Sequence, residues 1–463
     1  MSSLAGTRSE TALRKPPVQR GVPFLGILND LKRDPLGTFQ DAARAHGDVV
    51  RLALPMRAPV FLVNHPDLIR RVLQDNAANY VRSPFHHRLK GLLGEGLVTS
   101  EGALWRRQRR LMQPAFQANR VRSFVALTAD AVEELAERWG DGADIEMNEA
   151  MSALTLAIIQ RAMFSRERHV DQIGAVGEAV NTIQEHITRR FWAMTAWSER
   201  LPTPANRRYR AAVATADAAV AEIIAARAGR KDGPDDLLGR LLAARDEDGA
   251  AVDGGMSMSP RQIRDEVMTI LMAGHETSAT GLTWTWALLA QHPDIADRVR
   301  AEADAVLDGR RRPEWADVER LDYTRMVVQE ALRLYPPVAW FGRSAVADDR
   351  LGGFAVPAGA LVVFAPYLIQ RDPRFWPEPD RFDPERFAAA SVEARPGYAW
   401  FPFGGGPRIC IGSHFALTEM VAATTMLAQR FTMELARPTP IRGRALLTLR
   451  VDGGLPMRVR RIG

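Results

Sequence analysis

Apolar positions recur every three or four residues over long stretches of the middle of the chain. This spacing places apolar side chains on one face of a helix, and it predicts helices at residues 126–139, 211–228, 261–291 and 293–307. Shorter apolar runs bounded by Pro and Gly predict strands at residues 48–54, 59–64 and 360–366. Gly, Pro and charged residues cluster at residues 225–240, which predicts a loop between helices. The pattern therefore indicates a mostly α fold with small β-sheets.

Composition and charge narrow the class of protein. A chain of 463 residues with 46% hydrophobic content can bury a large core, as one large domain or as several smaller ones. We find no apolar leader and no run of about 18 apolar residues, so we expect a cytoplasmic protein without a membrane anchor. The net charge is +6, but the 25% of charged residues mix both signs along the chain. This mixture argues against a nucleic-acid-binding protein.

Cys410 is the only cysteine, which excludes an intramolecular disulfide and a Cys-rich zinc site. It follows Gly404–Gly406 and precedes apolar residues at helical spacing, so we predict that it lies at or just before a helix N-terminus, where backbone amides favour a thiolate. The glycines allow close approach of a flat ligand, and Arg408 can bind an anion. An inert buried cysteine and a phosphate-binding loop are the alternatives. No Gly-Lys-Ser/Thr follows, which excludes the loop.

The residues around Cys410 resemble a known family signature. Phe403, Gly406, Arg408, Cys410 and Gly412 reproduce F-x-x-G-x-R-x-C-x-G, which resembles the haem-thiolate signature of the cytochromes P450. The resemblance implies a cytochrome P450 fold with haem b as the cofactor. It also implies that the thiolate of Cys410 is the metal ligand on the proximal side of the haem iron, with Phe403 beside the haem.

Two further motifs occur in the order that this family has. Glu330 and Arg333 in "EALR" and Arg386 in "PERF" resemble three charges that interlock in the family. The segment "AGHET" resembles the family's A-G-x-[DE]-T on the helix that crosses the haem opposite the cysteine. The resemblance implies that Ala273 and Gly274 leave room for O2. Glu276 and Thr277 are then the catalytic residues that deliver protons to it.

Arginines resemble the groups that bind the haem propionates. Trp105 and Arg109 in "LWRRQRR" lie four positions apart, on one face of a helix, and resemble the family's W-x-x-x-R. Arg343 and Arg408 resemble further propionate ligands. The resemblance covers the chain from about residue 20, so we predict a flexible segment at residues 1–20 and a single domain at residues 21–463.

The family resemblance implies a haem-thiolate monooxygenase that uses O2. The electrons would come from a ferredoxin or flavodoxin with its reductase, because neither a flavodoxin-like nor a Cys-rich ferredoxin segment occurs in the sequence. Arg106, Arg107 and Arg110 are predicted to attract this acidic partner. We expect a monomer that does not bind nucleic acid.

The substrate is predicted from the segments that would line the pocket. These are residues 83–98, 186–197, 268–273, 338–341 and 446–449, which are apolar and aromatic with few charges. They suit hydroxylation or epoxidation of a fatty acid, a terpenoid or a polyketide-derived molecule. Arg189 or Arg190 is a candidate partner for a substrate carboxylate.

Two alternative functions share the predicted cysteine ligand. A peroxide-dependent peroxygenase does not need an acid and an alcohol to protonate oxygen, so the pair Glu276 and Thr277 argues against it. A haem-based sensor or binding protein needs neither this pair nor a substrate pocket. Sustained product formation with NAD(P)H separates such a protein from a monooxygenase.

Overall fold

A computed structural model describes residues 14–87, 89–165, 170–190, 201–227, 235–244, 257–437 and 440–462. Within these residues the chain is mostly helical. The α-helices are α1 (Leu28–Arg33), α2 (Pro35–His46), α3 (Pro66–Arg70), α4 (Pro84–His87), α5 (Lys90–Leu93), α6 (Gly102–Met112), α7 (Ala118–Arg138), α8 (Met147–Phe164), α9 (Val170–Arg190), α10 (Pro204–Arg227), α11 (Leu237–Ala243), α12 (Pro260–Leu289), α13 (Pro293–Leu307), α14 (Trp315–Arg320), α15 (Asp322–Leu334), α16 (Pro366–Ile369), α17 (Ala389–Glu393) and α18 (Ser413–Arg430).

The strands are short and form small sheets. They are β1 (Val18–Gln19), β2 (Val49–Leu52), β3 (Val60–Val63), β4 (Tyr80–Arg82), β5 (Asp144–Glu146), β6 (Phe341–Ala345), β7 (Asp349–Leu351), β8 (Phe354–Val356), β9 (Leu361–Phe364), β10 (Phe431–Leu435), β11 (Gly443–Ala445), β12 (Leu449–Val451) and β13 (Pro456–Arg461). The largest sheet has the order β1-β2-β3-β9-β6-β4. The others are β10-β13-β5, β11-β12 and β7-β8.

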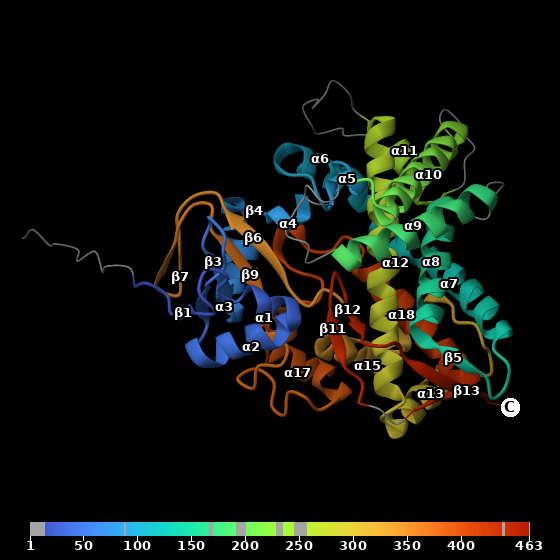
Figure 1. Cartoon of the computed structure of the whole chain (residues 1–463). Coiled ribbons are helices and arrows are strands. Elements are labelled where there is room, and N and C mark those ends of the chain that lie inside the picture. Colours follow the sequence, from blue (N-terminus) through green and yellow to red (C-terminus); the bar gives the residue numbers. More distant parts are fainter. Residues whose placement is uncertain are drawn as a thin grey trace, which may run out of the picture.

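The two halves of the molecule differ in secondary structure. Figure 1 shows the six-stranded sheet with α1–α3 on the left and the long helices on the right. The main hydrophobic core lies among α7, α8, α12, α15 and α18. Smaller cores lie on the two sides of the sheet. Among the residues described, no helix has the length and apolar character needed to cross a membrane.

The predicted elements are largely confirmed. The four predicted helices correspond to α7, α10, α12 and α13, and the three predicted strands to β2, β3 and β9. The loop predicted at residues 225–240 is too long, because α10 continues to Arg227 and α11 begins at Leu237. Asp236 caps α11 by accepting a hydrogen bond from the amide of Gly239, and it also pairs with Arg227. Residues 228–234 lie outside the described part of the chain.

The N-terminal boundary of the domain stays a prediction. Strand β1 pairs in parallel with β2, with Val18 opposite Arg51. The sheet therefore begins before residue 21, where we predicted the domain to start.

Helix α12 runs through the main core and positions the central part of the molecule. It begins with a capping box between Ser259 and Gln262. Gly281 lies against α18, since a Cβ at this position would be 2.7 Å from the sulfur of Met420. Because the glycine has no side chain, α12 and α18 approach closely at this point.

Candidate active site

The segment before α18 forms a tight loop around Cys410. The amide of Cys410 donates a hydrogen bond to the carbonyl of Phe403 (2.9 Å). Gly404 and Gly406 have φ values of 73° and 64°, in the left-handed region that favours glycine. A Cβ at Gly406 would lie 1.7 Å from the carbonyl oxygen of Leu73, so only glycine fits there. The helix begins at Ser413, which confirms that Cys410 lies just before a helix N-terminus.

The thiol of Cys410 is exposed to solvent although protein surrounds it closely. This combination is expected for a side chain on the wall of a recess. Burial raises the pKa of the thiol above its usual value, while the amide of Gly412 and the charge of Arg109 lower it. The expected stabilisation of a thiolate by the loop is therefore outweighed by desolvation.

Helix α6 packs its basic face against the Cys410 loop. Arg109 donates a hydrogen bond to the carbonyl of Ile409 (2.9 Å), the residue before the cysteine. Arg408 donates to the carbonyl of Ser100 (3.2 Å), and its guanidinium carbon lies 4.2 Å from the ring centroid of Trp105. Trp105 therefore holds Arg408 by a cation–π contact. The structure thus brings the three predicted residues of the loop and of α6 together.

Arg343 lies next to Arg82 and His86, which no sequence motif indicated. It is buried on β6, directly opposite Arg82 on β4, and its guanidinium donates to the carbonyl of Gly342 (3.0 Å). His86 lies 3.5 Å from the guanidinium of Arg82. Burial, followed by the charge of Arg408, lowers the pKa of Arg343 to about 10. Burial and the neighbouring arginines lower the pKa of His86 to about 2.

One carboxylate faces this cluster of cations. Glu101 pairs with Arg408 and accepts a hydrogen bond from the backbone amide of Arg82 (2.7 Å). The Nε atom of Arg82 is buried without a hydrogen-bond partner. Burial is the main cause that lowers the pKa of Arg82, and the charges of Arg343 and Arg408 add to it. Like charges on opposite strands destabilise a sheet, so the cluster suits a ligand that carries more than one negative charge.

The middle of α12 exposes one strip of an otherwise buried helix. Ala273 is exposed, and Gly274 and Thr277 are half-buried, whereas Met272, His275 and Glu276 are buried. The hydroxyl of Thr277 donates to the carbonyl of Ala273 (2.6 Å). The positions of these three residues, 273, 274 and 277, lie on one face of a helix. The strip therefore presents small side chains and one hydroxyl to an accessible space.

Glu276 points away from this strip and is held by the hairpin of β11 and β12. Its carboxylate forms a two-point ion pair with Arg450, with Oε2 accepting from Nη2 at 2.6 Å. The hydroxyl of Thr448 donates to Oε1 (2.6 Å). The acid and the alcohol are neighbours in sequence but have different surroundings. Arg450 and Thr448 lie more than 170 positions after Glu276 in the sequence, so no local pattern indicates them as its partners.

The predicted interlock of Glu330, Arg333 and Arg386 is confirmed. The Nε and Nη2 atoms of Arg333 donate to the carboxylate of Glu330 at 2.6 and 2.8 Å, and Arg386 lies 3.5 Å from it. Glu330 and Arg333 are fully buried, and Arg333 also donates to the carbonyls of Gln370 and Pro379. These extra hydrogen bonds satisfy the charges and make their burial tolerable.

Arg107 does not have the role that was predicted for it. Arg107 was predicted to face a redox partner with Arg106 and Arg110, but it is buried and donates to the carbonyl of Ser257 (2.9 Å). On α6 the position of Arg107 turns toward the start of α12 and not toward solvent. The side chains of Arg189 and Arg190, the candidate carboxylate ligands, lie outside the described residues.

The chain belongs to the cytochrome P450 family. The family model for cytochrome P450 matches residues 16–450. The chain is 37% identical to cyclooctatin synthase of Streptomyces melanosporofaciens over 93% of its length and 92% of the relative. It is 36% identical to pentalenene oxygenase of Streptomyces avermitilis, over 89% and 90% of the two chains. It is also similar to the crystal structure of a cytochrome P450 haem domain (TM-score 0.87, 28% identity, 97% and 98% coverage).

Membership of this family defines the class of enzyme. The chain is a haem-thiolate monooxygenase that acts on a hydrophobic small molecule. The residues that the structure describes suit a haem. They combine an accessible thiol, several cations around a single carboxylate and an accessible strip of small residues on α12.

Proposed function

We propose that this enzyme hydroxylates or epoxidises a terpenoid, with haem b as the cofactor. The observation that supports this most is the apolar character of the accessible side chains on the predicted pocket segments. Val98, Val338, Leu446 and Leu447 are half-buried, as is Phe341. A pocket with such a lining binds a ligand mainly through burial of apolar surface. Several relatives carry the names of oxygenases of terpenoids.

The haem would be held at two places in this proposal. Cys410 would provide the thiolate ligand. The propionates would be bound by Arg343, Arg408 and Arg109, together with Arg82, which the sequence did not indicate. Two carboxylates would satisfy these cations, for which Glu101 is the carboxylate partner among the residues that the structure describes, and so relieve their mutual repulsion. The haem, when bound, supplies the activation of O2 and the insertion of one oxygen atom.

Thr277 and Glu276 have different roles in the proposed proton delivery. The hydroxyl of Thr277, half-buried beside Ala273 and Gly274, would hold and pass on a proton at its Oγ1 atom. Glu276 lies one residue before it and is joined to Arg450, whose side chain is half-buried. We infer that this ion pair connects the interior to solvent, and that protons enter along it.

The electron donor is proposed to be an acidic ferredoxin or flavodoxin with its reductase. Arg106 and Arg110 are exposed on α6, and Ile409, whose carbonyl accepts from Arg109 of the same helix, is exposed in the Cys410 loop. Positive side chains around an exposed apolar residue suit an acidic protein partner. Arg107 is left out of this surface because it is buried. We expect the enzyme to be monomeric and cytoplasmic.

A screen for spectral changes tests the proposed substrate class. Cyclic terpene hydrocarbons, terpene alcohols, fatty acids and macrolides are titrated into the purified haem protein, and the hits are incubated with NAD(P)H, a surrogate ferredoxin system and ¹⁸O2. We expect terpenoids to shift the haem spectrum and to yield a product that carries one ¹⁸O atom. Spectral binding of fatty acids alone would overturn the substrate class. Equal turnover with peroxide in place of NAD(P)H would favour a peroxygenase.

A further inference from the structure

The turn between β1 and α1 carries a cluster of exposed apolar side chains. Phe24 is 99% exposed, Val22 is 53% exposed and Leu25 is 42% exposed. Single exposed apolar residues are common on protein surfaces, and they need no special explanation. Three large ones within four positions are less common, and such patches mark interaction sites.

The backbone holds this turn in one defined shape. Val22 and Gly26 exchange two hydrogen bonds, at 3.1 and 2.8 Å. The amide of Ile27 donates to the carbonyl of Ala53 (2.9 Å), which attaches the turn to the end of β2. A Cβ at Gly26 would lie 1.9 Å from the same carbonyl oxygen, so the contact requires glycine. The exposure of the apolar side chains is therefore built into the fold.

Phe24 has a strained backbone in addition to its exposed ring. Its φ is 64°, in the left-handed region that residues with a Cβ rarely adopt. The amide of Leu25 donates to the carbonyl of Pro23 (2.8 Å) within the same turn. Strain that the surrounding structure maintains is a feature of ligand-binding and other functional segments. Exposure and strain both disfavour this conformation in water, so we expect a partner that buries the ring.

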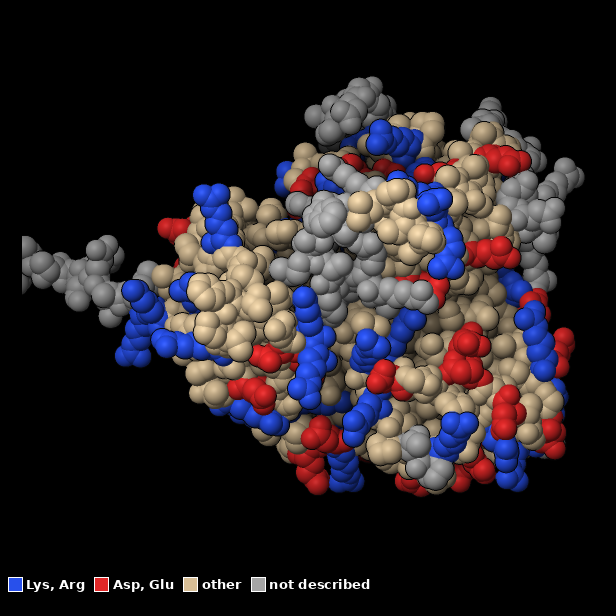
Figure 2. Space-filling view, in the orientation of Figure 1, with Lys and Arg blue, Asp and Glu red and all other residues tan. Residues whose placement is uncertain are grey.

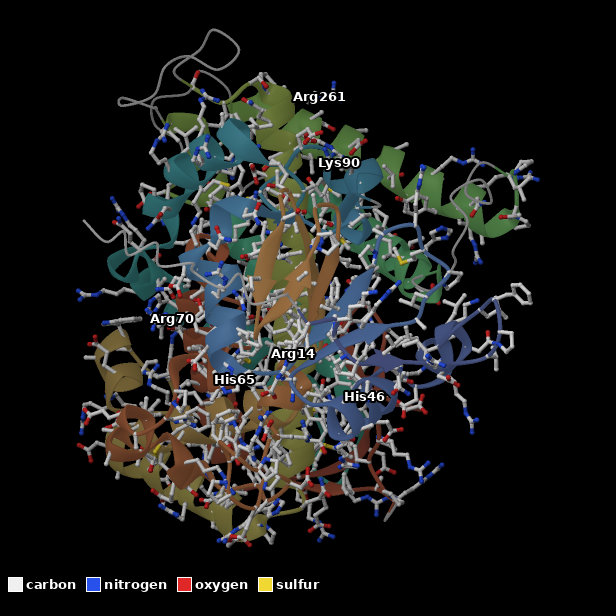
Figure 3. All side chains as sticks on the ribbon, turned by 90° about the vertical axis from the view of Figure 1, so that its left-hand side faces the viewer. Arg14, His46, His65, Arg70, Lys90 and Arg261 are labelled. Atoms are coloured by element: carbon white, nitrogen blue, oxygen red, sulfur yellow. The ribbon has the colours of Figure 1, made fainter. Side chains whose placement is uncertain are left out.

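The sequence on both sides of the apolar tip is basic. Residues 14–34 include Arg14, Lys15, Arg20, Lys32 and Arg33, which are all exposed, against two acidic residues, Asp30 and Asp34. Asp34 is engaged as the cap of α2, where it accepts from the amide of Gly37 (2.9 Å). Figure 2 shows basic side chains, with some acidic ones, toward the left margin of the molecule, where Figure 1 places β1. Figure 3 views the molecule from this side and labels Arg14 near the middle of the view.

We propose that the tip, Val22–Leu25, inserts into the surface of a bilayer that contains anionic lipids. Apolar and aromatic side chains flanked by Lys and Arg are the usual elements of reversible interfacial binding. Three side chains are too few for a stable protein interface, which normally involves 20 to 30 residues on each side. Three side chains are enough for the shallow insertion of one aromatic ring and two aliphatic groups into the surface of a bilayer. This contact does not depend on the identity of the substrate.

Vesicle flotation with the purified holoenzyme tests the proposal. Vesicles of phosphatidylglycerol and phosphatidylcholine are compared with vesicles of phosphatidylcholine alone, at low and high salt. We expect binding to the anionic vesicles that weakens with salt. Phe24→Ser should lower the binding constant about tenfold or more, because the transfer of a Phe ring from water corresponds to at least that factor. Arg20→Gln should lower binding to anionic vesicles by a smaller factor.

Val392→Ser is the matched control, since Val392 is 46% exposed on α17 and has no basic cluster in its sequence neighbourhood. It should bind as the unchanged protein does. The haem spectrum of each variant verifies that the fold is intact. Absence of binding to anionic vesicles, or equal binding by the Phe24 and Val392 variants, would overturn the proposal. A concentration-dependent dimer in the absence of lipid that Phe24→Ser abolishes would also overturn it, in favour of self-association.

Discussion

The Cys410 loop and the middle of α12 contribute to the same candidate site in different ways. The loop is shaped by contacts between residues close in sequence, such as the hydrogen bond from the amide of Cys410 to Phe403. The middle of α12 is organised by remote partners, since Glu276 is held by Thr448 and Arg450. The loop therefore combines a local hydrogen bond with remote contacts such as that of Arg109 with Ile409, whereas the surroundings of Glu276 depend on remote partners.

This difference separates two kinds of residue. Changes in the Cys410 loop should remove the chemistry itself, because no other thiol can replace the sulfur. Changes around α12 should leave the cofactor in place and alter how protons are delivered or how the helix is held. The following experiments test this separation.

Cys410→His should have the largest effect and abolish monooxygenase activity. The ferrous carbonyl complex should lose the absorption band that is typical of thiolate-ligated haem, because Cys410 is the only thiol in the chain. The spectrum of the variant, recorded with matched haem content, provides the measurement. Survival of the band would exclude Cys410 as the ligand.

Thr277→Ala should retain haem and substrate binding but lose coupling. Loss of a positioned proton donor typically slows the assisted step by a factor on the order of 10² to 10⁴. Reducing equivalents should then appear as hydrogen peroxide, measured together with product per NAD(P)H. Thr283→Ala is the control, because Thr283 makes the same type of hydrogen bond, to Ala279 at 2.8 Å, on the same helix. Equal coupling in both variants would argue against Thr277 as the donor.

Arg343→Gln should weaken haem binding and stabilise the apoprotein. Loss of a charge-assisted hydrogen bond corresponds to about 10- to 100-fold in affinity. Without haem, the same change removes a cation that opposes Arg82 and Arg408. Haem titration and thermal unfolding of the apoprotein measure the two effects. If Arg343 had only a structural role, its replacement would lower both haem affinity and the stability of the apoprotein. A fall in apoprotein stability would therefore contradict the assignment of Arg343 as a propionate ligand.

Arg109→Gln tests the same cofactor site from α6. It should lower haem affinity by about tenfold. Arg106→Gln, on the same helix but exposed, should leave haem affinity unchanged and slow reduction by the ferredoxin. If both variants lose haem equally, the proposed orientation of α6 toward the propionates is wrong.

Arg450→Gln should destabilise the folded protein by about 3 kcal/mol, because it leaves the carboxylate of Glu276 buried without its cation. Coupling should fall several-fold if the ion pair is the proton entry. The double variant with Glu276→Gln should recover most of the stability but not the coupling. Recovery of both would mean that the pair has only a structural role.

Glu266→Gln should have the smallest effect on activity, and it should alter the pH dependence of stability. Glu266 is buried ten residues before Glu276 and accepts a hydrogen bond from the amide of Leu97 (3.0 Å), while its other oxygen has no partner. Burial raises its pKa to about 8. Its contribution to stability is complete below about pH 4.5 and is lost as the pH rises through 8, by about 1 kcal/mol per pH unit. The variant should therefore gain stability relative to the unchanged protein as the pH rises from 6 to 8 and show no further gain above about 8, and parallel pH profiles would contradict the shift.

Local spacing was sufficient for the predictions that depend on neighbours in sequence. The helices at residues 261–291 and 293–307, the position of Cys410 before α18 and the pair of Glu330 and Arg333 follow from periodicity, glycines and i, i+3 spacing. These features are set by hydrogen bonds within a few residues. The same patterns, with the family resemblance, predicted the fold class and the class of enzyme.

Tertiary structure decided which groups meet. The facing of Arg82 and Arg343 depends on the pairing of β4 with β6, and the ion pair of Glu276 with Arg450 depends on where the β11–β12 hairpin contacts α12. The burial of Arg107 and the raised pKa of Cys410 depend on the density of protein around them. Desolvation and contacts between distant segments have no periodic signal in a sequence, because they arise only when the chain is packed.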